Sequence, residues 1–227
     1  MIVDNTANVI INSNFTLNNQ LTINNGGIVT INPQKSLIVF GDIANATGAS
    51  GIIIKASSTM ANGSLIFHNT TDNPVQATVE MYSSASWNLA NPEGERFNWQ
   101  FFGIPVYQIT ASPTFNDAYI RKKLEAGTTP LNHWQQLQSG STLQSFIGYQ
   151  IAQSEATKYS IKGTLVNSNF NSGPLTITTG AAYPGQHLFA NPYTAAIDIR
   201  QIDFGSSMEA SVYLYIVTGK QIGRAHV

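Results

Sequence analysis

The chain contains no cysteine, and charged residues make up only 10% of its 227 residues. The absence of cysteine excludes a disulfide framework, a thiolate metal site and a cysteine nucleophile. An average soluble domain carries roughly 25% charged residues, so asparagine, threonine, serine, glutamine and glycine must keep this chain soluble. Such a composition is typical of β-strands with polar outer faces and Asn/Gly turns. It does not suit surface helices, which usually carry glutamate and lysine.

A strong positive field and a membrane span are also missing. The formal net charge is −1, so we expect no nucleic-acid partner and no attraction to anionic lipid. The one basic run, residues 121–123 (Arg-Lys-Lys), follows a strand-like segment and is expected to be a solvated strand end. The longest apolar runs, such as residues 37–40, are too short to cross a bilayer. No signal peptide is visible at the start, so either the protein is not exported or this start is internal to a longer gene.

Residues 1–82 show a series of short apolar segments separated by Asn and Gly turns. Several segments alternate apolar residues with threonine or asparagine, which is the period of a half-buried strand. Strands at intervals of roughly 6 to 15 residues predict the coils of a β-solenoid, in which inward Ile, Leu and Val side chains stack in one column. A β-sandwich built of hairpins is the alternative, because the spacing is irregular. The expected strands are 9–11, 15–17, 21–23, 28–31, 37–40, 52–54 and 65–67.

The second half of the chain differs in character. Residues 83–97 lack a strand pattern and are expected to be a linker, and residues 98–218 hold longer, more aromatic strands. We therefore predict an all-β chain with a jelly-roll-like β-sandwich after the solenoid-like unit. A short helix is an option around residues 195–202. The expected strands are 99–104, 118–121, 133–137, 146–151, 159–165, 175–178, 187–189 and 212–215.

Three segments carry a resemblance to a known group of proteins. They are residues 98–106 (Asn-Trp-Gln-Phe-Phe-Gly-Ile-Pro-Val), 146–149 (Phe-Ile-Gly-Tyr) and 185–198, which contains Asn191-Pro192-Tyr193. Together with the strand at 212–215, they resemble the C-terminal region of large secreted proteins of Bacteroidetes. The resemblance implies export, typically through type IX secretion, a secreted or cell-surface location, and no established catalytic residues. The sorting domain that ends such proteins is not seen here.

No catalytic signature is present, and we expect no catalytic residue, no metal and no cofactor. A nucleophile elbow, a His-Glu-x-x-His motif, a phosphate loop and a dinucleotide fingerprint are all missing. Each histidine stands alone, without a second ligand at metal-binding spacing. Two carboxylate pairs, Glu93 with Glu95 and Asp198 with Asp203, could serve acid–base chemistry on sugars. Solvated loop carboxylates are the simpler interpretation of both pairs.

The aromatic residues offer one binding hypothesis. Trp87 and Trp134 have polar neighbours and could present a flat platform for a sugar ring, although core packing is the alternative for each. Trp99 lies in an apolar segment and is expected to be core. Asn191, Pro192 and Tyr193 are interpreted as a structural motif in which proline fixes a turn and tyrosine covers a sheet edge.

The last residues, 221–227, are expected not to belong to the protein. Residues 222–227 can be encoded by ATC GGA AGA GCA CAC GTC, which matches a common short-read sequencing adapter after its first two bases, and those bases would complete the codon of Gln221. A genuine polar tail with a chance match is the alternative. On the first interpretation the sandwich is truncated at its C-terminal side.

The sequence therefore predicts a non-catalytic structural or adhesive portion of a larger exported surface protein. A carbohydrate-binding module is the second hypothesis, and a fragment of a polysaccharide-active enzyme is the third. The expected partners are other domains of the same larger chain, another surface protein or a carbohydrate.

Overall fold

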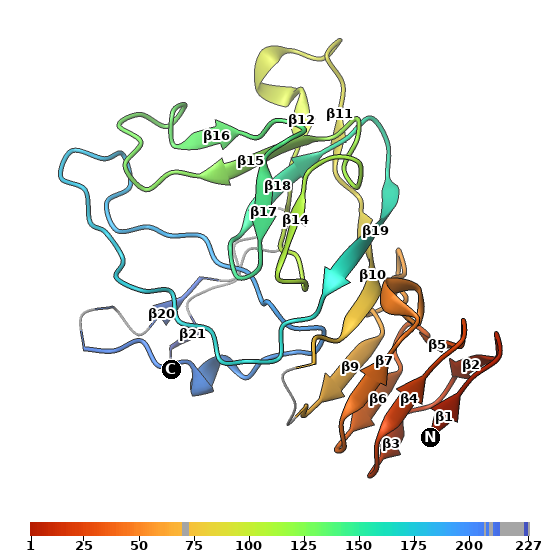
Figure 1. Ribbon diagram of the computed structural model, residues 1–227. Coiled ribbons are helices and arrows are strands. Elements are labelled where there is room, and N and C mark those ends of the chain that lie inside the picture. Colours follow the sequence, from red (N-terminus) through yellow and green to blue (C-terminus); the bar gives the residue numbers. More distant parts are fainter. Residues whose placement is uncertain (70–72, 207, 209–210, 214–224, 227) are drawn as a thin grey trace.

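The computed structural model describes residues 1–69, 73–206, 208, 211–213 and 225–226. The chain is all-β, as predicted, with a solenoid-like stack of parallel strands followed by antiparallel sheets (Figure 1). Within the described part of the chain, the helical elements are three single 3-10 turns. They are η1 (Gly48–Ser50), η2 (Glu93–Glu95) and η3 (Ile199–Gln201).

The N-terminal part winds through three coils, each of which gives one strand to each of three parallel sheets. The first sheet holds β1 (Ile2–Val3), β4 (Leu21–Ile23) and β7 (Ile43–Asn45). The second holds β2 (Asn8–Ile11), β5 (Ile28–Ile31) and β8 (Ile52–Ile54), and the third holds β3 (Phe15–Leu17), β6 (Ser36–Val39) and β9 (Ser64–Phe67). Every strand pair among these nine strands is parallel, so the solenoid prediction is confirmed against the hairpin alternative.

The register stacks like residues into columns. Val29 lies between Val9 and Ile52 in the second sheet, and both Val29 and Ile52 are fully buried. Burial of one such side chain contributes about 1.5–3 kcal/mol relative to its exposed state. Asparagine forms the corners, as expected from its tolerance of the left-handed region. Asn25, for example, has a φ of 45° and donates a hydrogen bond to Asp4 of the coil below at 2.8 Å.

Strand β10 (Gln76–Ser83) connects the solenoid with the rest of the chain. It pairs in parallel with β8 and, over its whole length, in antiparallel with β19 (Thr157–Thr164). The resulting sheet has the order β19-β10-β8-β5-β2, so hydrogen bonding runs without a break from the first coil into the antiparallel part. The proposed division at residues 82 and 98 stays a prediction, and the expected linker 83–97 contains β11 (Ser86–Trp87), η2 and the first residue of β12 (Phe97–Asn98).

The antiparallel part contains one four-stranded sheet and smaller ladders. The four-stranded sheet has the order β13 (Gln100–Phe102), β18 (Tyr149–Ala152), β15 (Tyr119–Lys123) and β16 (Trp134–Gln136). Strand β14 (Gln108–Thr110) pairs with β17 (Thr142–Gln144), and β11 pairs with β12. Phe102, Phe115, Tyr149 and Tyr159 form an aromatic core between these elements. Their assembly into a jelly-roll-like sandwich stays a prediction.

Two expected strands, 175–178 and 187–189, are not formed. Thr178 instead donates its backbone N–H to the carboxylate of Glu125 at 2.8 Å, and Leu188 accepts a hydrogen bond from the Gly148 amide at 3.0 Å. Apart from an isolated bridge between Ile147 and Phe189, neither of these two segments pairs with a strand. Alternation of apolar residues predicts a strand only where a neighbouring strand pairs with the backbone. A side chain bonds the backbone at Thr178, and the second segment makes only separate backbone hydrogen bonds with Phe146 and Gly148.

The C-terminal predictions are tested only in part. The turn η3 lies within the expected helix at 195–202. Strand β20 (Ser211–Val212) pairs with β21 (Ala225–His226), while residues 214–224 and 227 lie outside the described residues. The expectations for the strand at 212–215 beyond residue 213, and for the tail at 221–227, therefore stay predictions.

Candidate functional site: a ladder of rings and cations

Five side chains alternate ring and cation across one face of the four-stranded sheet. The guanidinium carbon of Arg121 lies 3.8 Å from the ring centroid of Trp99 and 4.8 Å from that of Trp134. The ammonium nitrogen of Lys123 lies 5.9 Å from the centroid of Trp134 and 4.9 Å from that of Tyr183. We call the set Trp99, Arg121, Trp134, Lys123 and Tyr183 the cation–ring ladder. All four contacts fall within the range of an attractive cation–π interaction.

The strand period explains this arrangement. Arg121 and Lys123 are two residues apart in β15 and therefore point to the same face, whereas Ile120 between Tyr119 and Arg121 points into the core and is only 2% exposed. The antiparallel register places Lys123 opposite Trp134 of β16. Residues 121–123 form the end of β15, as expected, but Arg121 and Lys123 are half-buried instead of fully solvated. Aromatic rings from β16 and from the segment before β13 cover these cations.

The ladder is positively charged. The Nε of Arg121 donates to the side-chain oxygen of Gln150 at 2.6 Å, and burial lowers the pKa of Arg121 to about 10, which still leaves it protonated at neutral pH. Burial also lowers the pKa of Lys123, while the charge of Glu125 acts in the opposite direction. Among the described residues, the ion pairs involve Glu80 and Asp198 and include neither cation of the ladder. The two positive charges thus form no ion pair with a carboxylate of the described residues.

Glu125 holds the loop that carries Tyr183. Its carboxylate accepts hydrogen bonds from the backbone N–H groups of Thr178 and Gly185, each at 2.8 Å, and from the hydroxyls of Thr178 and Thr176 at 2.6 and 3.0 Å. These hydrogen bonds lower the pKa of Glu125 to about 2. A shallow hollow lies beside this carboxylate, bordered by Leu124, Glu125, Ala126, Gly127, Thr128, Asn132 and Thr176. Because its acceptor oxygens are occupied by protein donors, Glu125 is a positioning group for the loop.

Ring contacts connect Trp87 to Trp99, and Arg121 connects Trp99 to Trp134, the second candidate tryptophan. Trp87 contacts Tyr119 edge-on with ring centroids 5.7 Å apart, Tyr119 contacts Phe97 in the same way at 5.4 Å, and Phe97 stacks on Trp99 at 4.9 Å. Trp87 and Trp134 are both half-buried, and Arg121, Phe101 and His133 all contact the Trp134 ring. Neither ring is a bare platform. Sugar stacking on them stays a prediction.

Sequence reasoning missed Trp99 and Arg121 as members of a site. Trp99 was expected to be core, but it is half-buried and lies against Arg121. The available signal was the spacing of Tyr119, Arg121 and Lys123 within one predicted strand, which places ring and cations on one face.

The Asn191-Pro192-Tyr193 motif forms a closed turn. Asn191 accepts a hydrogen bond from the amide of Tyr193 at 2.9 Å and donates one to the carbonyl of Ala195 at 2.7 Å, while Pro192 is buried. The hydroxyl of Tyr193 donates to the carbonyl of Ser168 at 3.0 Å. The turn places Thr194 against the last coil, where its hydroxyl donates to the carbonyl of Leu65 at 2.7 Å.

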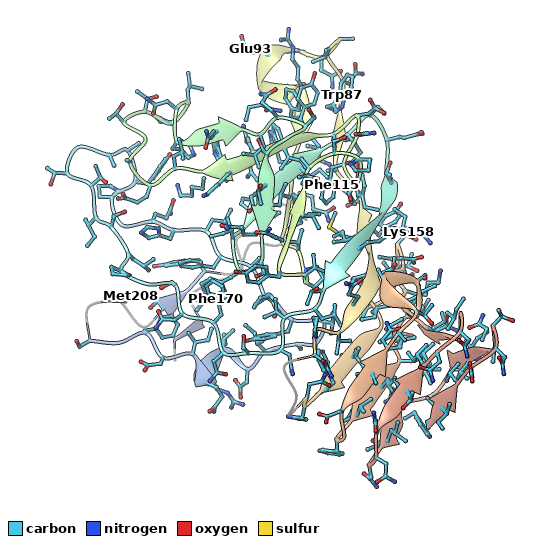
Figure 2. All side chains as sticks on the ribbon, viewed as in Figure 1. Trp87, Glu93, Phe115, Lys158, Phe170 and Met208 are labelled. Atoms are coloured by element: carbon cyan, nitrogen blue, oxygen red, sulfur yellow. The ribbon has the colours of Figure 1, made fainter. Side chains whose placement is uncertain are left out.

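The candidate acid–base pairs do not form a facing pair of free carboxylates. Glu93 and Glu95 are exposed in η2, at the far end of the molecule from the solenoid (Figure 2). Asp198 is bound by Arg200, and Asp203 accepts the amide of Gly205 at 2.8 Å. The part of the chain that the structure describes contains no group of three metal-ligating side chains. It also contains no helix long and apolar enough to cross a membrane.

Comparisons with known proteins add one relative. No family model and no solved structure matches the chain. Over 211 residues the chain is 36% identical to the minor fimbrium subunit Mfa5 of Porphyromonas gingivalis, an alignment that covers 88% of this chain. The chain spans 16% of the length of that relative. Porphyromonas gingivalis is a member of the Bacteroidetes, so the comparison supports the resemblance drawn from the sequence, whereas type IX export stays a prediction. The chain is thus similar to one segment of a bacterial fimbrial protein.

Proposed function

We propose that this chain is a structural portion of a larger cell-surface protein that assembles with other surface or fimbrial proteins. The observation that carries the proposal is the 36% identity to a minor fimbrium subunit over 88% of the chain. The fold is consistent with this role, because one continuous sheet connects the solenoid to the antiparallel part and gives a stiff body without a joint in its hydrogen bonding. The similarity to a fimbrium subunit gives no support to the carbohydrate-binding alternative.

The direct test is a chimera of the relative. The matched segment of Mfa5 is replaced by this chain with an epitope tag, and the chimera is produced in a strain of Porphyromonas gingivalis that lacks its own Mfa5. We expect the tag to be found on intact cells and in purified minor fimbriae. A chimera that is stable in the cell but missing from the surface and from fimbriae would refute the proposal.

A scrambled insert of equal length serves as the control. If only the chimera with this chain reaches the fimbriae, assembly requires this fold. If the scrambled insert reaches them as well, the relative tolerates any insertion at that place.

A further inference from the structure

The cation–ring ladder has the composition of a protein interface. Tryptophan, tyrosine and arginine dominate the residues whose truncation costs most binding energy in protein complexes, and the ladder contains two tryptophans, a tyrosine and an arginine within one sheet face. We propose that the ladder is the docking surface for an acidic surface of a partner protein in the assembly, an inference that rests on the proposed function.

Charge indicates the chemistry of the partner. Arg121 and Lys123 are partly desolvated by the rings on which they lie, and no described carboxylate forms an ion pair with either. The Nε of Arg121 is held by Gln150, which fixes the plane of the guanidinium. A guanidinium fixed in this way presents its terminal N–H groups in the geometry that suits a carboxylate. Aspartate or glutamate side chains of a partner would form ion pairs with both cations.

Shape favours a protein over a small molecule. Small ligands bind in concave sites that enclose most of their surface, and the hollow beside Glu125 and the hollow around Phe115 include none of Arg121, Lys123 and Trp134. One hollow borders Glu125, whose negative charge disfavours an anion, and the other lies around Phe115. A broad face with rings and cations suits a partner that covers it.

The solenoid coils do not cover the ladder. The four-stranded sheet lies at the end of the molecule away from the solenoid coils (Figure 1). Tyr183, at one end of the ladder, is 40% exposed and is held there by the loop that Glu125 anchors. The rigid loop lowers the entropic cost of ordering this ring on binding.

The test uses the whole chain and minor fimbriae purified from Porphyromonas gingivalis without its own Mfa5. The purified chain is immobilised and its binding to the fimbriae is measured at rising salt. We expect binding that weakens with salt and falls at least about tenfold in the double variant R121E/K123E, because both charges would then repel the acidic partner. Lys162→Glu is the matched control, since Lys162 is exposed on β19, outside the ladder, and we expect its effect to stay within about twofold.

Two milder variants keep the test valid if the double variant does not fold. Lys123→Glu changes one half-buried charge and Tyr183→Ala removes one exposed ring, and each should weaken binding while the melting temperature stays near that of the unchanged chain. Equal binding by all ladder variants would overturn the inference. So would ladder-dependent binding of polygalacturonate without binding of fimbriae, or ladder-dependent self-association of the chain in sedimentation.

The two proposals fail separately. If the chimera enters fimbriae and its R121E/K123E form enters equally well, the docking surface is refuted and the surface role stands. If the unchanged chimera reaches neither the surface nor the fimbriae, the proposed function is refuted.

Discussion

The hydroxyl of Thr194 donates a hydrogen bond to the backbone carbonyl of Leu65 at 2.7 Å, across 129 residues of sequence. Leu65 lies in β9, the last strand of its sheet, whose outer edge would otherwise be open. The side-chain amide of Asn167 continues this cover, with its nitrogen 2.9 Å from the carbonyl of Phe67 and its oxygen 3.2 Å from the amide of Asn69. Side chains of the antiparallel part thus cover an edge of the solenoid with which no described strand pairs.

This closure predicts a small but measurable cost for removing the hydroxyl. Thr194→Val keeps the side-chain shape and leaves the half-buried carbonyl of Leu65 without its donor, so we expect a loss of about 1 kcal/mol in the free energy of unfolding. Thr16→Val, on an exposed position of β3, is the control and should change stability by less than about 0.5 kcal/mol. Denaturant melts give the free energy of unfolding of both variants. Equal values would contradict the view that Thr194 stabilises the edge of β9.

Glu80 predicts how stability depends on pH. Burial acts to raise the pKa of Glu80, but hydrogen bonds from Lys55, Lys158 and the Ala56 amide outweigh it and hold the pKa below the usual 4.5. Lys55 directly follows β8 within the last coil and Lys158 lies on β19, beside β10 (Figure 2), so the carboxylate connects both parts of the chain. A carboxyl with a lowered folded pKa stabilises above its unfolded pKa, and this contribution disappears as the pH falls through the folded value.

We therefore expect Glu80→Gln to cost about 1.5–3 kcal/mol at pH 7 and to flatten the loss of stability below pH 4.5. Glu155→Gln, at an exposed position, is the matched control. An unchanged acid limb of the stability profile in the Glu80 variant would show that this carboxylate does not join the two parts.

Two glycines allow the segment 187–190 to pack against the antiparallel part. A Cβ on Gly103 would overlap the Cβ of Ala190, and a Cβ on Gly148 would lie 2.5 Å from Cγ of Leu188. We expect Gly103→Ala and Gly148→Ala each to lower the free energy of unfolding by about 1–3 kcal/mol through overpacking. The effect should be larger at Gly103, because the methyl group of Ala190 cannot move away by rotation about a side-chain bond. Gly140→Ala meets no atom within 4 Å and serves as the control. Thermal melts that rank the three variants differently would contradict this packing.

We expect the chain to have no polysaccharide hydrolase or lyase activity. Glu93 and Glu95 are exposed in η2, and the carboxylates of Asp198 and Asp203 accept hydrogen bonds from Arg200 and Gly205. The purified chain is incubated with a panel of polysaccharides and reducing ends are measured. Turnover that is lost on changing any of these four carboxylates would overturn the prediction.

The parts of the fold that depend on neighbouring residues could be predicted from the sequence. The solenoid strands follow from period-2 alternation with Asn corners such as Asn25, whose left-handed backbone is a local property. The ladder depends on through-space pairing, because Trp99 lies between β12 and β13 and Arg121 lies on β15, and the sequence does not state how these elements are arranged in the sheet. The same limit explains residues 175–178, which alternate like a strand while Glu125, some fifty residues earlier, binds Thr178.

The sequence segments that resemble Bacteroidetes surface proteins meet in space. Gly103 of the first segment lies against Ala190 of the third, and Gly148 of the second lies against Leu188. These segments are distant in the chain but pack against one another, and this shared packing explains why they carry the resemblance together.

We expect the solenoid and the antiparallel part to form one structural body, because hydrogen bonding runs without a break from β2 to β19. Residues 1–82, expressed alone, test it most directly, because this fragment lacks β19, Asn167, Thr194 and Lys158. We predict that the fragment associates or aggregates and shows no cooperative thermal transition, since the last coil then exposes its backbone edge and apolar column. A soluble monomer that melts cooperatively would contradict the claim.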